Sequence, residues 1–376
     1  MRIVYVLTSL GMGGTEKQAL AIAQHMAESG HVVALLVLRP RLAEQWPTPL
    51  DTIHLDMRRN PASAISGLFR ARSFLRDFKP DLIHSHSFHA NVFARCLKPL
   101  LPRLKVLSTI HNVFEGGRSR MLAYRLTDPL SRKTAAVSEA VAQRFIQIKA
   151  VPRDKCTVVT NGIDVLEFAP GPARRASARA QMGLESERSP FIWLAAGRIV
   201  PAKDFPNLLS AFKQVREKLP DVELWIAGAP PEFKEVRPAA SAVHSVIEIV
   251  ADRGYWQQVR WLGLRRDMPA LLDAADAFVS ASAWEGMPLA VGEAMAMEKF
   301  VVATDVGGVR ELVGNAGTVI PPQDSGALAG AMIAAMQRSQ QNRVHSGQLA
   351  RERIRRNFCM AGRAESWEAL YRDLIA

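Results

Sequence analysis

Two glutamates eight residues apart, Glu285 and Glu293, flank a short segment that could bind an anion, Gly286-Met287-Pro288-Leu289. We expect a helix to begin at this segment, because proline suits the first helical position, where its missing N–H costs nothing. The free N–H groups and the positive dipole end of such a helix attract an anion. Carboxylates beside an anion site favour a ligand that carries both phosphate and hydroxyl groups, and a nucleotide sugar is the simplest such molecule.

The spacing of these glutamates also distinguishes two kinds of chemistry. At about 1.5 Å of rise per residue, the two carboxylates lie roughly one ligand length apart. This separation favours contacts with two parts of one molecule over an acid/base pair acting on a single bond. A solvated or helix-capping role is the alternative for either glutamate alone.

Two cations, Arg198 and Lys203, lie five residues apart in a loop that follows an expected strand at 191–196 and precedes an expected helix at 208–219. Two cations on one loop can grip a diphosphate from one side. The alternative for each of them is a solvated place on the surface.

The elements that position these residues follow from hydrophobic periodicity. Apolar runs at 277–279 and 300–303 predict two buried strands joined by the helix that begins near residue 289. In such a βαβ unit the helix N-terminus lies over the carboxyl edge of a parallel sheet, where ligands bind.

The first residues predict a second unit of the same kind, with a strand at 2–7, a glycine-rich turn at 8–15, a helix at 16–28 and a strand at 32–38. Gly13 and Gly14 lie in this turn, but such loops are shared by many nucleotide binders. A NAD enzyme would carry an acidic residue at the end of the second strand, and Leu38-Arg39-Pro40 supplies none. This disfavours a dehydrogenase and leaves an NADP variant open.

Three histidines, His84, His86 and His111, come at the ends of two expected strands. Polar residues at strand ends line the crevice of an open α/β sheet. A metal site is disfavoured, because no carboxylate or cysteine is spaced with these histidines. Hydrogen-bonded packing is the simpler interpretation.

Composition excludes several classes of protein. The chain has 376 residues, 48% of them hydrophobic and 22% charged, which is typical of a globular protein of two domains. We expect neither a secretory signal nor a membrane-spanning helix. The three cysteines are widely spaced and form no CxxC pair, which favours a reducing cytoplasm without disulfides or structural zinc.

All of the net charge of +12 falls in the first half, where residues 1–190 hold 27 Lys and Arg against 15 Asp and Glu. An anionic membrane, an anionic substrate, nucleic acid or a solubilising surface could each account for it. The segment 118–133 mixes cations with apolar side chains, a pattern that suits an anionic membrane surface. A solvated covering helix is the alternative for this segment.

Several of these motifs together resemble one family. Glu285-x7-Glu293, the following Asp305-Val306-Gly307-Gly308-x2-Glu311 and the loop around Arg198 and Lys203 are similar to signatures of retaining GT-B glycosyltransferases of the GT4 type. The turn Asn161-Gly162-Ile163-Asp164 matches a further family pattern. The resemblance implies an α/β protein of the GT-B fold, with two Rossmann-like parallel-sheet domains that face each other across a cleft.

The resemblance also implies roles for individual residues. Arg198 and Lys203 would neutralise the leaving diphosphate, Glu293 would bind the ribose hydroxyls, and Glu285 and His111 would hold the sugar ring. Beyond these, it implies donor contacts from Gly13 and Gly14 near the distal phosphate, from 286–289 at the helix end, and from Leu262 and Arg265 near the base. No metal is implied, since the chain contains no Asp-x-Asp, and the nucleotide sugar is a substrate rather than a cofactor.

We therefore expect an acceptor-binding domain at 1–175, an interdomain linker within 169–187, and a nucleotide-sugar-binding domain at 188–355. The resemblance implies that a last helix, at about 356–376, packs back on the first domain. The loop Gly228-Ala229-Pro230-Pro231 departs from the usual Gly-x-Gly of the family. This departure leaves open how base and ribose are covered.

The expected function is transfer of a hexose or N-acetylhexosamine, with retention, from a nucleoside-diphosphate sugar to an acceptor in cell-surface polysaccharide synthesis. UDP is the expected carrier, the acceptor is expected to be lipid-linked or a glycan, and the enzyme is expected on the cytoplasmic membrane face. A nucleotide-sugar epimerase of similar fold is one alternative. A basic nucleic-acid-binding protein is another, although the chain lacks an aromatic-basic strand or zinc finger of the known kinds and this class leaves Glu285-x7-Glu293 unexplained.

Overall fold

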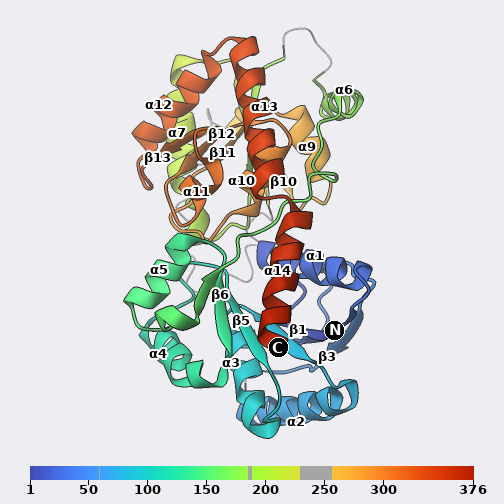
Figure 1. The fold of residues 1–376 in the computed structure, drawn as a ribbon. Coiled ribbons are helices and arrows are strands. Elements are labelled where there is room, and N and C mark those ends of the chain that lie inside the picture. The colour runs from blue at the N-terminus through green and yellow to red at the C-terminus, as the bar shows by residue number, and fades with distance from the viewer. Residues whose placement is uncertain (59, 185–188, 229–255) are drawn as a thin grey trace. The chain divides into compact units, whose positions relative to one another are not determined.

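The computed structural model of the chain describes residues 1–58, 60–184, 189–228 and 256–376 (Figure 1). Contacts divide the chain into two compact units, of which unit 1 comprises Met1–Gly162 with Met360–Ala376, and unit 2 comprises Ile163–Cys359. Each unit has its own parallel sheet and its own apolar core. The predicted architecture of two Rossmann-like domains is therefore confirmed.

Unit 1 contains a seven-stranded sheet in the order β3-β2-β1-β4-β5-β6-β7. Its neighbouring strands all pair in parallel. The central strands are apolar along their whole length because helices cover both faces of a parallel sheet. The strands are β1 (Arg2–Leu7), β2 (Val32–Val37), β3 (Asp51–His54), β4 (Leu82–His86), β5 (Val106–Ile110), β6 (Lys133–Ala136) and β7 (Cys156–Val158).

The first and last helices of the chain pack together on one face of this sheet, and their apolar side chains share a core with Tyr5 and Leu107. The second and third helices cover the other face, in a core with Val4 and Ile83. The helices of unit 1 are α1 (Gly14–Glu28), α2 (Pro61–Phe78), α3 (Phe88–Leu97), α4 (Arg118–Thr127), α5 (Glu139–Gln147) and α14 (Met360–Ile375).

Unit 2 contains a six-stranded parallel sheet in the order β10-β9-β8-β11-β12-β13. Its strands are β8 (Phe191–Ala196), β9 (Val222–Ala227), β10 (Val259–Gly263), β11 (Ala277–Ser280), β12 (Phe300–Thr304) and β13 (Thr318–Ile320). Its described helices are α6 (Pro172–Gln181), α7 (Phe205–Lys218), α9 (Met268–Ala274), α10 (Leu289–Ala296), α11 (Val309–Val313), α12 (Ser325–Met336) and α13 (Gln340–Asn357).

Each sheet has one place where the strand order reverses, between β1 and β4 in unit 1 and between β8 and β11 in unit 2. In open α/β sheets, ligands bind outside the carboxyl ends of the strands at such a switch point, because the connections leave toward opposite faces there. The residues that follow β1, β4, β8 and β11 are therefore candidates for ligand binding.

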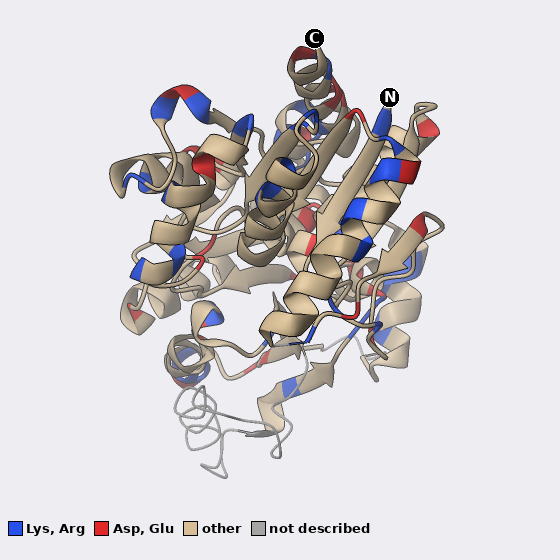
Figure 2. Ribbon diagram, turned by 90° about the horizontal axis from the view of Figure 1, so that it is seen from below, with Lys and Arg blue, Asp and Glu red and all other residues tan. Residues whose placement is uncertain are grey.

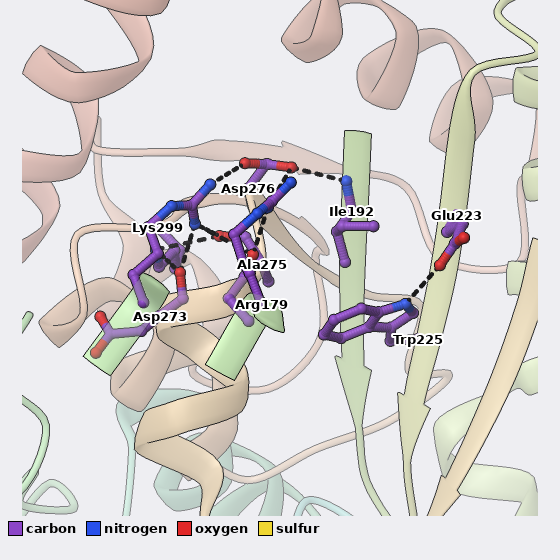
Figure 3. A network of polar contacts seen from close by, with 10 residues as sticks. Arg179, Ile192, Glu223, Trp225, Asp273, Ala275, Asp276 and Lys299 are labelled. Atoms are coloured by element: carbon purple, nitrogen blue, oxygen red, sulfur yellow. Dashed lines mark hydrogen bonds and ion pairs between the residues drawn. The ribbon is translucent and has the colours of Figure 1, made fainter. Parts of the chain in front are cut away.

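The segment expected to link the domains has a different structure. The two units divide after Gly162, and residues 172–181 form α6 inside unit 2. Three arginines hold α6 against the end of α9. Arg174 pairs with Asp273, and Arg175 bonds to the last carbonyls of α9 and to Asp276. Arg179 bonds to the carbonyl of Ala274 and pairs with Asp276 (Figure 3). An arginine- and alanine-rich sequence resembles a linker by composition, but here its cations satisfy carbonyls that a helix end leaves unpaired.

Asp276 joins this network to the sheet. Its carboxylate accepts a hydrogen bond from the backbone N–H of Ile192 at 2.9 Å, at the start of β8 (Figure 3). Lys299 donates to the carbonyl of Ala275 at 3.2 Å, and burial lowers the pKa of this lysine to about 8. Lys299 thus has a structural role.

Other sequence expectations differ in detail or lie outside the structure. Pro288 is the residue before α10 rather than its first helical residue. Residues 229–231 of the unusual loop, residues 185–187 of the expected linker and residue 188, the expected start of the second domain, lie outside the described residues. The tail helix α14 belongs to unit 1, where Trp367 and Tyr371 are buried in the core. Within the described parts of the chain, no helix is both long and apolar enough to cross a membrane.

Candidate active site

At the switch point of unit 2, the loop after β8 meets the loop after β11. The first loop carries Lys203 at the end of a short 3-10 turn, and its ammonium group forms an ion pair with the carboxylate of Glu285 from the second loop. The backbone also joins the loops, since the N–H of Ala283 donates to the carbonyl of Ala202 at 2.9 Å. A cation and a carboxylate predicted from separate motifs therefore lie in one site.

Glu285 is held by its own loop. Its side chain is buried, and the hydroxyl of Ser282 donates to its Oε1 atom at 2.8 Å. The carbonyl of Ser282 in turn accepts a hydrogen bond of 2.6 Å from Thr304 Oγ1, at the end of β12. This chain of contacts fixes the carboxylate, which is what a group that orients a ligand requires.

The glycines after β12 support the same loop. Gly307 has a φ of +54°, and a Cβ at this position would come within 2.2 Å of the carbonyl oxygen of Glu285. The N–H of Gly308 donates to the carbonyl of Gly286 at 2.6 Å. Only glycine permits this close approach, so the glycine pair that contributes to the family signature shapes the Glu285 loop.

The second glutamate of the motif lies on α10. Glu293 is the fifth residue of this helix and is buried. Met287 and Pro288, which precede the helix, are buried as well, while Leu289 is partly exposed. The helix N-terminus thus lies beside the Glu285 loop, as the sequence pattern predicts.

Arg198 lies in the same β8 loop as Lys203, directly after Gly197, whose φ is +154°. Its side chain is exposed and has no hydrogen-bond or ion-pair partner among the residues that the structure describes. A cation without a protein partner keeps its charge available for an anion.

Leu262 and Arg265 lie at the end of β10, the edge strand of this sheet. Arg265 is already paired, with two bonds of 2.8 and 2.6 Å to the carboxylate of Asp267. The contacts found for these two residues do not join them to Lys203 or Glu285. They remain candidates for the base-binding side of the site.

In unit 1 the residues that follow β4 and β5 also come together. His86 ends β4, His111 follows β5, and His86 Nδ1 lies 2.9 Å from His111 Nε2. His84, on the same face of β4, bonds instead to Tyr371 of α14 and to Thr109, each at 2.7 Å. His84 therefore has a structural role.

The carboxylate of Glu16 occupies part of the space beside the glycine-rich turn after β1. Gly13 precedes α1, and a Cβ built on it would lie 2.3 Å from a carboxylate oxygen of Glu16, in the first turn of that helix. A carboxylate near a helix N-terminus is favoured by the helix dipole. A phosphate that approaches Gly13 and Gly14 would therefore meet Glu16 first.

Glu115 is a candidate functional residue that carries no motif in the sequence. Its carboxylate accepts hydrogen bonds from the N–H of His111 at 2.9 Å and from the hydroxyl of Tyr124 at 2.6 Å. It also accepts one from the N–H of Phe88, at the start of α3. Burial raises the pKa of Glu115 to about 7, against the opposing effect of these hydrogen bonds.

Within the described ranges, no group of three or more His, Cys, Asp or Glu residues is arranged to hold a metal ion.

Comparison with known proteins identifies the family. The model for "Glycosyltransferase Family 4" matches residues 12–167, and the model for "Glycosyl transferases group 1" matches residues 190–338. The chain belongs to the GT4 glycosyltransferases. It is a retaining glycosyltransferase that uses nucleotide-sugar donors, as its motifs imply.

One relative is the Escherichia coli UDP-Gal:alpha-D-GlcNAc-diphosphoundecaprenol alpha-1,3-galactosyltransferase. It is 26% identical over 322 residues, which cover 83% of this chain and 80% of the relative.

Solved structures agree on the fold. Anabaena HepE in complex with UDP-glucose superimposes with a TM-score of 0.81 at 22% identity, covering 98% of this chain and 99% of HepE. Sucrose-phosphate synthase from Thermosynechococcus elongatus gives a TM-score of 0.85 at 18% identity, covering 100% of this chain and 99% of that one. These likenesses confirm the GT-B fold.

Proposed function

We propose that this GT4 enzyme transfers a hexose or N-acetylhexosamine from a UDP-sugar to a lipid-linked acceptor at an anionic membrane surface. The proposed use of a UDP-sugar donor rests on the ion pair between Lys203 and Glu285 at the switch point of unit 2. Arg198, an exposed cation, lies in the same loop as Lys203. The proposal for the acceptor is supported by the surface of unit 1.

The leaving diphosphate is the part of the donor that needs charge stabilisation as the sugar bond breaks. Arg198 and Lys203 supply two fixed cations, and the N-terminus of α10 adds peptide dipoles. These groups can carry the developing charge without a divalent cation. Activity that persists in EDTA would agree with this assignment, whereas loss restored by Mg²⁺ would contradict it.

The two carboxylates suit the hydroxyl-bearing parts of the donor. Glu285, fixed by Ser282, is assigned to the sugar ring, and Glu293 to the ribose hydroxyls. In unit 1, His111 is assigned a contact with the transferred sugar. Carboxylates bind vicinal hydroxyls well because each oxygen can accept more than one hydrogen bond.

The surface of unit 1 combines positive charge with exposed apolar side chains. Residues 1–162 and 360–376 hold 25 Lys and Arg against 14 Asp and Glu, whereas unit 2 holds 23 against 22. On α4, Leu122 and Leu126 are 55% and 69% exposed, and they share a helical face with the exposed Arg118 and Arg125. A surface of this kind suits anionic lipid.

Helix α2 presents a comparable surface. Ile65 and Phe69, one turn apart, are 56% and 60% exposed, and Arg76 is exposed two turns further along the same helix. The E. coli relative is named for an acceptor that carries a diphosphate on a polyprenol. An acceptor of this class would combine the negative charge and the lipid that the surface of unit 1 favours.

Incubation of the purified protein with UDP-hexoses and UDP-N-acetylhexosamines tests the proposal. Each donor is offered with and without a sugar-diphosphate polyprenol in vesicles. The proposal predicts a lipid-linked product extended by one sugar, formed only with acceptor. Appearance of the epimeric nucleotide sugar without acceptor would favour an epimerase instead.

A further inference from the structure

The pairing of His86 with His111 follows from strand register. β4 and β5 run in parallel with His84 opposite Leu107 and His86 opposite Thr109. Alternate residues of a strand share a face, so His111 continues the row of Leu107 and Thr109. His84 reaches Thr109 and His86 reaches His111 with the same diagonal offset. The contact therefore follows from the register of β4 and β5, continued one residue beyond the end of β5.

The ring of His86 has little freedom. It is 1% exposed and stacks on Tyr5, with centroids 5.9 Å apart and planes at 15°. The ring of His84 packs against it with a centroid distance of 4.1 Å. Aromatic packing on these sides fixes the direction of His86 Nδ1.

The backbone of His111 is fixed from the other direction. The Glu115 carboxylate accepts from the N–H of His111 and from that of Phe88, so it joins the loop after β5 to the start of the helix after β4. Glu115 itself is held by Tyr124, whose hydroxyl also accepts a hydrogen bond from Asn91 at 2.9 Å. Both partners of the imidazole pair are thus held in place by buried groups.

One proton lies between the two rings. Burial lowers the pKa of His111 to about 3 and that of His86 well below its usual value, with a smaller effect of the neighbouring histidines on His86. Both rings are therefore neutral near pH 7. A neutral imidazole has one N–H and one bare nitrogen, so the ring that donates in the pair must be identified.

Either His111 or His86 can donate the hydrogen bond between the two rings, and the surroundings of His86 Nε2 indicate which ring donates. Its Nε2 is buried and has no hydrogen-bond partner in the described part of the chain. If His111 donated, the proton of His86 would be on Nε2, as a buried N–H without an acceptor. If His86 donates, its Nε2 is a bare acceptor, and proteins tolerate an unsatisfied acceptor more often than an orphaned N–H. The second arrangement places the proton of His111 on Nδ1.

We propose that His86 is a positioning residue that holds His111 as its Nδ1-protonated tautomer, so that His111 presents a hydrogen-bond donor to an oxygen of the transferred sugar. This inference rests on the proposed function, in which His111 contacts that sugar. No Nδ1 partner for His111 is found among the described residues, so this N–H is available to a ligand. In this state His111 binds a sugar oxygen and does not act as a base.

Nitrogen-15 spectra of the histidine side chains test the tautomer directly, because protonated and bare ring nitrogens give distinct shifts. The signals are assigned with His86→Phe and His111→Ala. We expect Nδ1-protonated His111 in the wild-type protein and a mixture of tautomers in His86→Phe, which keeps a ring of similar size but cannot donate. Wild-type spectra with His111 protonated on Nε2 would overturn the proposal.

Kinetic measurements distinguish a role of His86 in positioning His111 from a role in packing alone. Loss of one hydrogen bond predicts a kcat roughly three- to tenfold lower in His86→Phe, with the KM for the donor changed less. In His86→Asn the amide nitrogen can take the place of Nδ1, and we expect most of the turnover to return. Equal kcat values in His86→Phe, His86→Asn and the wild type would contradict the proposal.

His84→Phe serves as the matched control. It keeps a ring packed against His86 but loses the bonds of His84 to Tyr371 and Thr109, and His84 does not bond to His111. It should lower the melting temperature without changing the His111 tautomer. The proposed function has its own test in His111→Ala. Full activity of that variant would remove His111 from the site, whereas the spectra would still report whether His86 sets its protonation.

Discussion

Lys203 and Glu285 form an ion pair in the site, so a diphosphate that binds Lys203 must exchange with a carboxylate already in contact with it. Arg198 has no such competitor among the described residues. The two cations should therefore differ in what they contribute to diphosphate binding, although we propose that both stabilise the leaving group.

Replacing either Arg198 or Lys203 by alanine should lower kcat by roughly 10²-fold, because each change removes a preorganised charge from the leaving diphosphate. Steady-state rates at saturating donor measure this. Lys213→Ala, at an exposed position on α7, is the matched control and should leave kcat unchanged. Near-wild-type rates in both site variants would remove the cation pair from the mechanism.

The two glutamates should respond in opposite ways when UDP is titrated into the protein. Glu285→Gln removes the charge that competes for Lys203, so UDP should bind more tightly while kcat falls. Glu293→Gln weakens acceptors for the ribose hydroxyls, so UDP should bind several-fold more weakly. Isothermal titration calorimetry measures both affinities. A parallel loss of affinity in the two variants would show that Glu285 does not compete with the diphosphate.

We expect kcat to depend on pH near neutrality because of Glu115. Because burial raises its pKa to about 7, the carboxylate that fixes the His111 backbone becomes protonated as the pH falls below that value. kcat should fall on this acidic limb, and Glu115→Gln should flatten it. His111 itself, with a pKa of about 3, cannot produce a limb there. The positive charge of Arg120 lowers the pKa of Glu115, but burial has the larger effect.

The raised pKa of Glu115 also makes the free energy of unfolding depend on pH. The folded state binds the Glu115 proton more tightly than the unfolded state, so the group favours folding below about pH 4.5, and this contribution is lost between pH 4.5 and 7. In Glu115→Gln, the free energy of unfolding should fall less steeply across this window than in the wild type. Urea unfolding at several pH values measures the difference, and identical slopes would contradict the raised pKa.

Residues of the candidate site can be predicted from the sequence where they lie close together along the chain, because their spacing then indicates their geometry. The spacing of Arg198 and Lys203, and of Glu285 and Glu293, could be recognised because each pair lies in one loop or one loop-helix junction. Glu115 could not be recognised, since a single glutamate in a loop has no period or spacing. The pairing of His86 with His111 needs the register of two strands, which alternating residues suggest but do not fix.

At the scale of elements, α4 is the helix whose surface most needs an explanation. Arg120, which the sequence pattern groups with the membrane-facing cations, donates to the carbonyl of Glu115 at 3.0 Å and lies over the ring of Phe88. It therefore has an internal role. Arg118, Leu122, Arg125 and Leu126 remain as the exposed face.

Vesicle binding should depend on this face. Co-sedimentation with anionic vesicles should be strong at low ionic strength and fall steeply at high salt, because each cation near the surface adds only about 1 kcal/mol and is screened. Arg118→Ser with Arg125→Ser should weaken binding without changing donor affinity. Arg153→Ser with Lys149→Ser, exposed outside α4, is the control pair. Equal binding to neutral and anionic vesicles would contradict an electrostatic attachment.

Helix α6 shows where sequence reasoning at the element scale fails. Its alanines and arginines have no apolar stripe, so periodicity favours a linker. The helix is stabilised instead by guanidinium groups that bond to the end of α9, and this partner lies about 100 residues further along the chain. The strands were easier to predict, because fully buried parallel strands are continuous apolar runs.

At the scale of the whole molecule, the charge follows the structural division of the chain. Unit 1 carries nearly all of the net positive charge, and unit 2 is almost neutral. Figure 2 shows Lys and Arg distributed over several helices rather than gathered on one. A broad basic surface fits attraction to a membrane or to an anionic acceptor, since either acts over a distance comparable to the Debye length.

We propose that Arg198 and Lys203 bind the diphosphate of the donor while Glu293 binds its ribose. A crystal structure of the protein with UDP, grown in the presence of EDTA, tests this most directly. We predict phosphate oxygens within hydrogen-bonding distance of both cations and ribose hydroxyls within hydrogen-bonding distance of Glu293. A diphosphate bound away from Arg198 and Lys203, or UDP that binds only when a divalent cation is restored, would contradict it.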